Sequence, residues 1–321
     1  MSAEARPRQS LRSLRFHRYG PPADVLQLET VEAPRPGPGQ VRVAVHACGL
    51  NPADWALCGG LFAGELPRGI GLEVSGVVDA LGEGVHDVAV GALVFGATFW
   101  KGPTAGASDL ALLSHWTAVP TGLDPPQAAA LPMAAETAYR SLEDLEVKAG
   151  QTVLINGAGT MVGYAAVQLA LLRDARVIAT AGPTYAEDLR ALGALVTDYG
   201  DGLAERVGAL ARGPVDRTLD TGPASEVIPA LIQITGAPDR VMTVGNFGGK
   251  VFGLRMGQSG LRYDKLPEFA RLAAQGRLRV PIARTYPLEG WRDALQRSQS
   301  RRAHGKLLLA ISDEAVARVD G

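Results

Sequence analysis

The chain has 321 residues, which is more than one ordinary hydrophobic core holds, so we expect two domains. Its formal net charge of −1, with acidic and basic residues interspersed, predicts no electrostatic surface for nucleic acid or for an anionic membrane. No apolar run reaches the roughly 18 residues that a membrane-spanning helix needs. Its two cysteines, Cys48 and Cys58, cannot form a disulfide framework and suit a reducing cytoplasm.

The first 130 residues read as strands and turns. Residues 40–47, QVRVAVHA, alternate apolar and polar side chains, which is typical of a half-buried strand. Short β-like runs divided by glycines follow, and prolines at positions 34, 36 and 38 mark a loop. No helix longer than one or two turns is expected before residue 125.

After residue 150, strand-like runs alternate with helical patterns. Because such alternation builds parallel sheets with right-handed crossovers, we expect an α/β fold with a doubly wound parallel sheet. The first predicted helix lies at 162–173. The predicted strands lie at 152–156, 176–180, 195–199, 217–221, 240–245 and 250–254. From about residue 282 the sequence is strand-like again, and it ends in a run over 305–311.

Three glycines, Gly157, Gly159 and Gly163, lie where the first of these strands runs into its helix. In a doubly wound sheet this turn holds a pyrophosphate, because residues without Cβ let backbone N–H groups approach the phosphates and the helix N-terminus adds partial positive charge. The spacing GxGxxxG is one residue longer than the usual dinucleotide fingerprint, and glycine-rich turns also simply join strands to helices. The placement between a strand and a helix favours the dinucleotide site.

The end of the second strand bears on the choice of cofactor. An NAD site usually has an acidic residue there, which binds the ribose 2′-OH. Here Thr180 is followed by AGPTY, and the first acids, Glu187 and Asp188, belong to the next helix. Since no carboxylate repels a 2′-phosphate, we expect NADPH to be preferred; the alternative is indifference between the two cofactors.

Five motifs follow one another along the chain: NPAD at 51–54, GLEVSGVV at 71–78, TAY at 137–139, the glycine turn, and GKLLL at 305–309. With these motifs in this order, the chain resembles the zinc-independent quinone oxidoreductases of the medium-chain dehydrogenase/reductase superfamily. The resemblance implies a GroES-like, β-rich catalytic domain over residues 1–132, completed by 282–321. It implies a Rossmann NADP-binding domain over residues 133–281, with the active site in the cleft between the two.

In the zinc enzymes of that superfamily Cys, His and Cys hold the catalytic metal, and the matching positions here are Asn51, Leu72 and Met133. Amide, aliphatic and thioether side chains do not replace thiolate and imidazole ligands, so we expect no bound metal. Without a Lewis acid, reduction of a conjugated C=C suits the site, because the developing enolate needs only hydrogen-bond donors and a proton. The predicted function is NADPH-dependent reduction of a quinone or an α,β-unsaturated carbonyl (enone or enoyl) substrate.

Three side chains are candidates for catalysis, each with a structural alternative. Asn51 either donates to a carbonyl or enolate oxygen or forms an Asx turn before Pro52. Trp55 either lines an aromatic substrate pocket or packs in the core. Glu136 is either a buried acid with a raised pKa or a helix-start carboxylate satisfied by backbone N–H groups, and we favour the second interpretation.

The resemblance also implies cofactor contacts. It places Thr137 and the residues after the fifth strand near the nicotinamide, and Tyr199 against the 2′-phosphate. The family's lysine for that phosphate is absent, so Thr184, Tyr185 or Arg190 is expected to substitute. The predicted cofactor-binding residues are Gly157, Gly159, Thr160, Met161, Val162, Gly163, Thr180, Thr184, Tyr199, Thr137, Gly245, Asn246 and Phe247.

Two other functions stay open. One is a pathway-specific enoyl or cyclic-enone reductase of secondary metabolism. The other is a catalytically silent, crystallin-like or nucleic-acid-binding member of the superfamily, against which the near-zero net charge and the complete glycine turn argue. We expect a small-molecule substrate, no nucleic acid or membrane partner, a homodimer and a cytoplasmic location.

Overall fold

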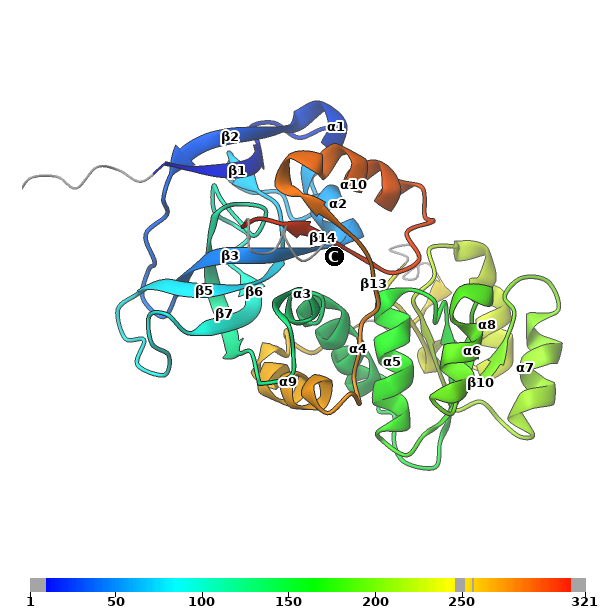
Figure 1. The fold of residues 1–321 in the computed structure, drawn as a ribbon. Helices are drawn as coiled ribbons and strands as arrows, with labels where there is room; N and C mark the ends of the chain where they lie inside the picture. Colours follow the sequence, from blue (N-terminus) through cyan, green and yellow to red (C-terminus); the bar gives the residue numbers. More distant parts are fainter. Residues whose placement is uncertain (1–9, 246–251, 256, 313–321) are drawn as a thin grey trace, which may run out of the picture. The chain divides into compact units, whose positions relative to one another are not determined.

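The computed structural model describes residues 10–245, 252–255 and 257–312, and the chain forms two compact units. The first unit contains Met1–Met133, Tyr263–Ala274 and Ile282–Gly321. The second contains Ala134–Arg262 and Gln275–Pro281. Figure 1 shows the elements of both units coloured along the chain.

The first unit is rich in β-structure. A three-stranded sheet has the order β2-β1-β4, and a six-stranded sheet has the order β13-β14-β3-β5-β6-β7. The strands are β1 (Ser10–Phe16), β2 (Leu26–Glu32), β3 (Val41–Leu50), β4 (Arg68–Gly69), β5 (Glu73–Leu81), β6 (Leu93–Thr98), β7 (Leu110–Ala118), β13 (Ile282–Pro287) and β14 (Lys306–Ala310).

Strand β3 is the centre of the six-stranded sheet because it pairs with three neighbours. One edge pairs with β5, while the other pairs with β7 through Val41–Ala44 and with β14 through Ala47–Leu50. The pairing of β3 with both β5 and β7 closes these strands and β6 on themselves. The alternating burial of β3 agrees with the half-buried strand predicted for residues 40–47.

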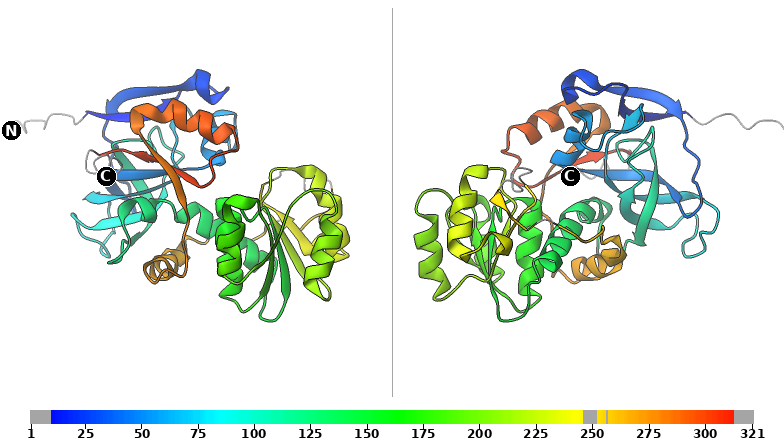
Figure 2. Two further views of the ribbon diagram at one scale, coloured as in Figure 1. Left: turned by 45° about the vertical axis from the view of Figure 1, so that its right-hand side comes forward. Right: turned by 180° about the vertical axis from the view of Figure 1, so that it is seen from behind.

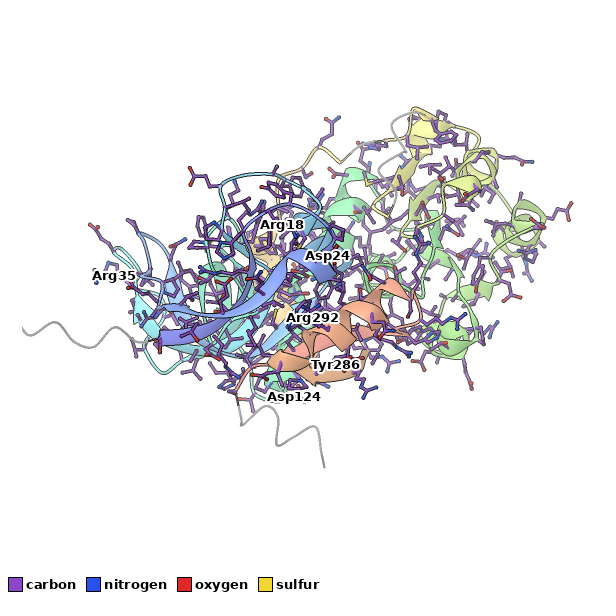
Figure 3. All side chains as sticks on the ribbon, turned by 90° about the horizontal axis from the view of Figure 1, so that it is seen from above. Arg18, Asp24, Arg35, Asp124, Tyr286 and Arg292 are labelled. Atoms are coloured by element: carbon purple, nitrogen blue, oxygen red, sulfur yellow. The ribbon has the colours of Figure 1, made fainter. Side chains whose placement is uncertain are left out.

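Short helices cover the strands of this unit: α1 (Pro22–Val25), α2 (Pro52–Cys58), α3 (Pro125–Ala129), α9 (Leu266–Ala274) and α10 (Trp291–Gln299). Helix α10 was not predicted, since the sequence after residue 282 reads as strands. It packs Trp291, Ala294 and Leu295 into the core of the unit. Arg292 also donates from Nη1 to the Ala23 carbonyl oxygen at 2.9 Å, which ties α10 to the α1 segment seen beside it in Figure 3.

The segment Tyr263–Ala274 groups with the β-rich unit rather than with the residues predicted around it. Helix α9 has a strongly apolar face, with Leu266, Phe269 and Leu272 buried, and it contacts β7. The Tyr263 ring lies 5.4 Å from the His115 ring on the same strand. Burial of this apolar face therefore sets the boundary that sequence pattern alone did not show.

The second unit is a five-stranded parallel sheet with the order β10-β9-β8-β11-β12. Helices lie on both sides of the sheet, as Figure 2 shows. The elements are α4 (Pro132–Asp144, whose first two residues belong to the other unit), β8 (Thr152–Asn156), α5 (Met161–Leu171), β9 (Arg176–Thr180), α6 (Pro183–Ala191), β10 (Leu195–Thr197), α7 (Leu203–Ala211), β11 (Arg217–Asp220), α8 (Ile228–Thr235) and β12 (Val241–Thr243).

The predicted fold class, a doubly wound α/β unit beside a β-rich unit, is confirmed. The central strand β8 is buried at every residue, as strands covered on both faces are. The strand predicted over 250–254 is wrong for its described residues, 252–254, which are not extended. There Arg255 forms only an isolated bridge to Met242, so five strands rather than six make the described sheet.

Candidate functional site

The turn between β8 and α5 is built around two glycines that cannot be replaced. Gly157 has φ of 76°, and a Cβ there would lie 2.7 Å from the Gly222 nitrogen. A Cβ on Gly163 would lie 2.5 Å from the Gly157 carbonyl oxygen and 2.7 Å from the Thr221 hydroxyl. These two glycines serve close packing of the turn against its own helix and against the loop after β11.

The middle glycine differs from the other two. A Cβ on Gly159 would meet only one atom, in the Tyr185 ring, at 3.9 Å. Around it, the backbone N–H groups of Gly159, Met161 and Val162 have no hydrogen-bond partner among the described residues. These N–H groups are half-buried at the start of an eleven-residue helix, and donors in such a position are suited to binding an anion. The predicted pyrophosphate position therefore has open space and free donors.

Two threonines hold the turn in this shape. Thr160 caps α5 by accepting the Gly163 N–H at 3.0 Å, and its hydroxyl donates to the Thr221 hydroxyl at 2.9 Å. The Thr221 hydroxyl also lies 2.9 Å from the Gly157 carbonyl oxygen. The turn is thus shaped by bonds within the protein, and its remaining N–H groups stay available.

Polar side chains at the ends of the parallel strands form a continuous chain of hydrogen bonds. The Thr180 hydroxyl accepts the Gly157 N–H at 2.9 Å and donates to Asn156 Oδ1 at 2.8 Å. Asn156 Nδ2 donates to Asp220 Oδ1 at 2.8 Å, and the Thr243 hydroxyl donates to Asp220 Oδ2 at 2.9 Å. The ends of β9, β8, β11 and β12 are therefore linked through side chains.

Of these four residues the sequence reasoning named only Thr180. The missed signal is that each buried strand ends on a polar residue: Asn156, Asp220 and Thr243. Burial raises the pKa of Asp220, while its bonds from Asn156, Thr243 and the Gly222 N–H lower it. Because the carboxyl ends of parallel strands share one edge, such residues must meet at the ligand-binding edge of the sheet.

The structure brings Tyr199 to the end of the second strand, where the cofactor's ribose was predicted. The Tyr199 ring and hydroxyl lie 3.6 Å from the position of a Cβ on Gly182, and the side chain is 67% exposed. The Ala181 N–H donates to the Thr197 carbonyl oxygen at 3.1 Å, which joins the two loops. Thr184 is exposed in the first turn of α6.

Arg206 was not predicted, and it supports the loop that carries Tyr199. Its Nε donates to the Thr197 hydroxyl at 3.2 Å. Its terminal nitrogens donate to the carbonyl oxygens of Asp198, Gly200 and Asp201. A single guanidinium therefore binds three carbonyl groups of one short loop and fixes its path.

The residues predicted at the nicotinamide end are placed as follows. Thr137 is half-buried on α4, and its carbonyl oxygen accepts the Ser141 hydroxyl at 2.6 Å. Gly245 is exposed, and a Cβ there would lie 2.3 Å from the Gly222 carbonyl oxygen. Asn246 and Phe247 lie outside the described residues.

In the β-rich unit, Asn51 lies in a cluster of buried charged groups. Its side-chain Nδ2 donates to Glu73 Oε1 at 2.9 Å and to Asp54 Oδ2 at 3.3 Å. Its Oδ1 accepts from Lys306 Nζ at 2.6 Å. Every polar atom of the amide is therefore engaged, and a bond to a substrate oxygen has to replace the longest of these contacts, the one to Asp54.

Glu73 and Lys306 form an ion pair inside this cluster. Neither side chain is more than 2% exposed. Glu73 Oε2 also accepts the Met133 N–H at 2.7 Å, and Asp54 Oδ1 accepts the N–H groups of Gly71 and Leu72 at 2.8 and 3.0 Å. The three positions that match metal ligands in the zinc enzymes thus surround two carboxylates and one ammonium group.

Asp54 is completely buried, and burial raises its pKa to about 6. The charge of Glu73 raises the pKa further, while the N–H groups of Asn51 and Gly71 lower it. Burial also raises the pKa of the neighbouring thiols, to about 12 for Cys58 and well above its ordinary value for Cys48. Neither thiol is therefore a thiolate near pH 7.

The contacts of Trp55 agree with packing in the core, whereas Glu136 lies beyond the first turn of α4 and is held by an arginine and a distant N–H group rather than by helix-start N–H groups. Trp55 is 6% exposed within the core, and its indole N–H donates to the Ser298 hydroxyl at 2.9 Å. Glu136 is 1% exposed and accepts from Arg140 Nε at 2.7 Å and from the Arg262 N–H at 3.0 Å. The predicted catalytic roles of both residues stay untested.

Metal clusters and membrane-spanning helices are both absent from the described residues. No group of three or more His, Cys, Asp and Glu side chains there has the arrangement of a metal site. Among the same residues, no helix combines the length and the apolar character needed to cross a membrane.

Comparison with known proteins gives two family matches. Residues 37–119 match the alcohol dehydrogenase GroES-like domain, and residues 177–309 match the zinc-binding dehydrogenase domain. Human quinone oxidoreductase is 35% identical over 178 residues, which is 54% of this chain and 53% of that protein. The spectinabilin polyketide synthase system protein NorB of Streptomyces orinoci is 34% identical over 90% of this chain, which spans only 14% of NorB.

Solved structures give the same family. The quinone oxidoreductase from Coxiella burnetii superposes with a TM-score of 0.74 at 26% identity, covering 95% of this chain and all of that one. AibC superposes with a TM-score of 0.83, also at 26% identity, over 98% of this chain and all of that one.

The raised pKa of Asp54 predicts a pH dependence of stability. A folded-state pKa of about 6 lies above the ordinary value of 3.8, so its contribution to stability is fully present below 3.8 and is lost as the pH rises through 6. When the pH falls from 7 to 5, the free energy of unfolding of the wild type should rise by about 1 kcal/mol relative to that of Asp54→Asn. Urea denaturation at both pH values measures this, and parallel pH profiles of the two proteins would contradict it.

Proposed function

This chain belongs to the medium-chain dehydrogenase/reductase superfamily as a quinone oxidoreductase-like oxidoreductase, and we propose that it reduces quinones or α,β-unsaturated carbonyl compounds with NADPH and without zinc. The observation that carries the proposal is the set of residues around Asn51. They supply hydrogen-bond donors and buried charge where zinc relatives place metal ligands. The family uses a nicotinamide cofactor, which when bound supplies a hydride.

The turn after β8 fits such a cofactor. Gly159 has open space at its Cβ position, and the free N–H groups of Gly159, Met161 and Val162 suit a pyrophosphate. Thr160 and Gly163 shape this turn through the cap of α5. The buried Thr180 contributes through its bond to the Gly157 N–H, so we expect it to act on the cofactor by holding the turn.

The cluster around Asn51 does not fit a zinc ion. Leu72 offers no donor atom, Met133 a thioether, and Asn51 an amide oxygen that already accepts from Lys306. The ammonium group of Lys306 is the cation of this site, and Glu73 neutralises it. Polarisation of a substrate carbonyl by a metal is therefore not part of the proposal.

We propose that Asn51 donates an N–H to the substrate oxygen. Glu73 and Lys306 cancel in charge, and Asp54 adds a negative charge when it is ionised. An enolate oxygen would therefore meet no uncompensated positive charge in this cluster. The amide N–H of Asn51 is the group that can stabilise it. Lys306 holds Oδ1 of the same amide, which turns Nδ2 toward the carboxylates and fixes its orientation.

A preference for NADPH is supported by the end of β9. Ala181 and Gly182 follow Thr180, so no carboxylate occupies the position that binds a ribose 2′-OH. Tyr199 lies against Gly182 with an exposed ring, as the resemblance implies for a residue at the 2′-phosphate. The N-terminus of α6, which has no side-chain cap, adds partial positive charge beside them.

A second candidate, an enoyl reductase of a biosynthetic pathway, is favoured by one finding. The similarity to the NorB polyketide synthase protein extends over 90% of this chain, further than the similarity to human quinone oxidoreductase. Both candidates share the hydride chemistry and differ in substrate. The catalytically silent alternative has no observation in its favour.

Turnover of a substrate panel tests the proposed function and its independence of zinc. NADPH oxidation should proceed with quinones, simple enones or enoyl thioesters, and the preferred class separates the two candidates. Incubation with a chelator should leave the rate within about twofold, and elemental analysis should find far less than one zinc per chain. Activity lost on chelation and restored by zinc would overturn the metal-free mechanism.

Gly159→Val tests the cofactor turn. The branched side chain fills the open space above the turn, so NADPH affinity should fall at least tenfold, or about 1.4 kcal/mol, with the fold retained. Gly208→Val is the matched control, because a Cβ on Gly208 of α7 has similar open space, with nothing within 4 Å. Titration calorimetry with NADPH compares the two, and equal losses would show that the turn does not hold the phosphates.

Gly182→Asp tests the choice of cofactor. Gly182 is the N-cap of α6 with φ of −76°, so Asp is sterically acceptable there and places a carboxylate beside Tyr199. The NADPH-to-NADH affinity ratio should fall about tenfold, because the carboxylate repels the 2′-phosphate. Gly182→Asn is the neutral control of the same size, and an identical ratio in both variants would contradict the assignment.

A further inference from the structure

Arg68 is a buried cation that has no charged partner among the described residues. The side chain lies on β4 in the β-rich unit and is 1% exposed, which makes it the bulkiest completely buried side chain of the described residues. Its Nη1 donates to the Phe62 carbonyl oxygen at 2.7 Å, while Nε and Nη2 have no hydrogen-bond partner in the described part of the chain. No described carboxylate forms an ion pair with it.

The two free nitrogens are the pair that binds oxyanions. In an arginine, Nε–H and one Nη2–H point the same way and together match the two oxygens of a carboxylate or phosphoryl group. Arg42 shows this arrangement in the same protein: its Nε and Nη2 donate to the two oxygens of Asp79, each at 2.9 Å. In Arg68 the equivalent fork is empty.

One aromatic ring lies over this guanidinium group, and a second ring packs against the first. The guanidinium carbon of Arg68 lies 5.2 Å from the centre of the Trp100 ring, and Lys101 Nζ lies 5.6 Å from the same ring. The Phe62 ring is 5.7 Å from Trp100 and 66% exposed, and Phe62 has φ of 52°, in the left-handed region that only a few non-glycine residues adopt. Strain of this kind gathers at ligand-binding segments.

From these observations we propose that Arg68 and Trp100 form a binding site for a flat, unsaturated molecule that carries an oxyanion. The exposed Phe62 ring and the Lys101 ammonium group complete the site. The carboxylate or phosphoryl group pairs with Nε and Nη2 of Arg68. The flat part of the molecule lies against Phe62. Because both nitrogens are buried, a segment must move before a ligand reaches them, and we expect it to be the exposed segment from Phe62 to Leu66, whose Phe62 carbonyl oxygen binds Nη1.

Burial explains why the site should be selective. A buried guanidinium without hydrogen bonds on two nitrogens is unfavourable, and the Trp100 face compensates it only in part. An anion that satisfies both donors removes this penalty, whereas a neutral molecule of the same shape does not. Charge, rather than shape alone, should therefore decide what binds.

Titration calorimetry on the full chain without nucleotide tests the site with three probes: benzoate, phenyl phosphate and neutral benzamide. Benzoate, phenyl phosphate or both should bind at least tenfold more tightly than benzamide. The stronger of the two identifies the oxyanion. Equal affinity for benzamide, or no binding by either anion, would overturn the proposal without any variant, and since no hydride transfer is measured, the reductase function would stand.

Variants then locate the site. Arg68→Lys keeps the charge and loses the fork, so anion affinity should fall at least tenfold. Phe62→Ala changes an exposed side chain, so the protein should keep its stability while its affinity for both anions falls. This variant tests the site even if Arg68→Lys does not fold. Arg284→Gln is the matched control, because Arg284 is an exposed arginine 5.0 Å from the Tyr286 ring centre. Anion binding that is unchanged in Phe62→Ala, or reduced equally in Arg284→Gln, would contradict the site.

Discussion

The buried ion pair between Glu73 and Lys306 determines how the β-rich unit arranges the segments around Asn51. Each charge is removed from water, and a buried charge is tolerated only when its neighbours supply hydrogen bonds. Glu73 takes these from Asn51 and from the Met133 N–H, and Lys306 donates to the Asn51 amide oxygen. Four separate segments of the chain are therefore held together by the requirement to satisfy one pair of charges.

The parallel sheet meets a similar requirement at its carboxyl edge. There the buried acid is Asp220, and its partners are the uncharged Asn156 and Thr243 and the Gly222 N–H. Because Asn156 also binds Thr180, which holds the Gly157 N–H, the acid is connected to the glycine turn through two side chains. A cooperative chain of this kind supports the turn without using the N–H groups of Gly159, Met161 and Val162.

The sequence predicted what depends on local pattern. The strand over 152–156, the start of α5 near residue 161 and the glycine turn follow from periodicity and from glycine placement, and the structure has them. Helix α10 was missed, because its nine residues carry only three buried apolar side chains, at the helical spacing i, i+3 and i+4, and lie between two strands. The docking of α9 on β7 was missed as well, since nothing local specifies which unit an amphipathic helix covers.

The candidate site shows where local reasoning ends. Asn51 was identified from its motif, but its partner Lys306 is 255 residues away, and only the fold reveals that every polar atom of the amide is bound. Glu73 and Lys306 lie within the motifs GLEVSGVV and GKLLL, where each reads as part of a family signature without a role of its own. A charged residue at the start of an apolar strand was the available signal, because such a residue, once buried, must find a partner of opposite charge elsewhere in the core. The same reasoning identifies Arg68, a buried charge for which the described residues provide an aromatic face and one carbonyl group but no carboxylate.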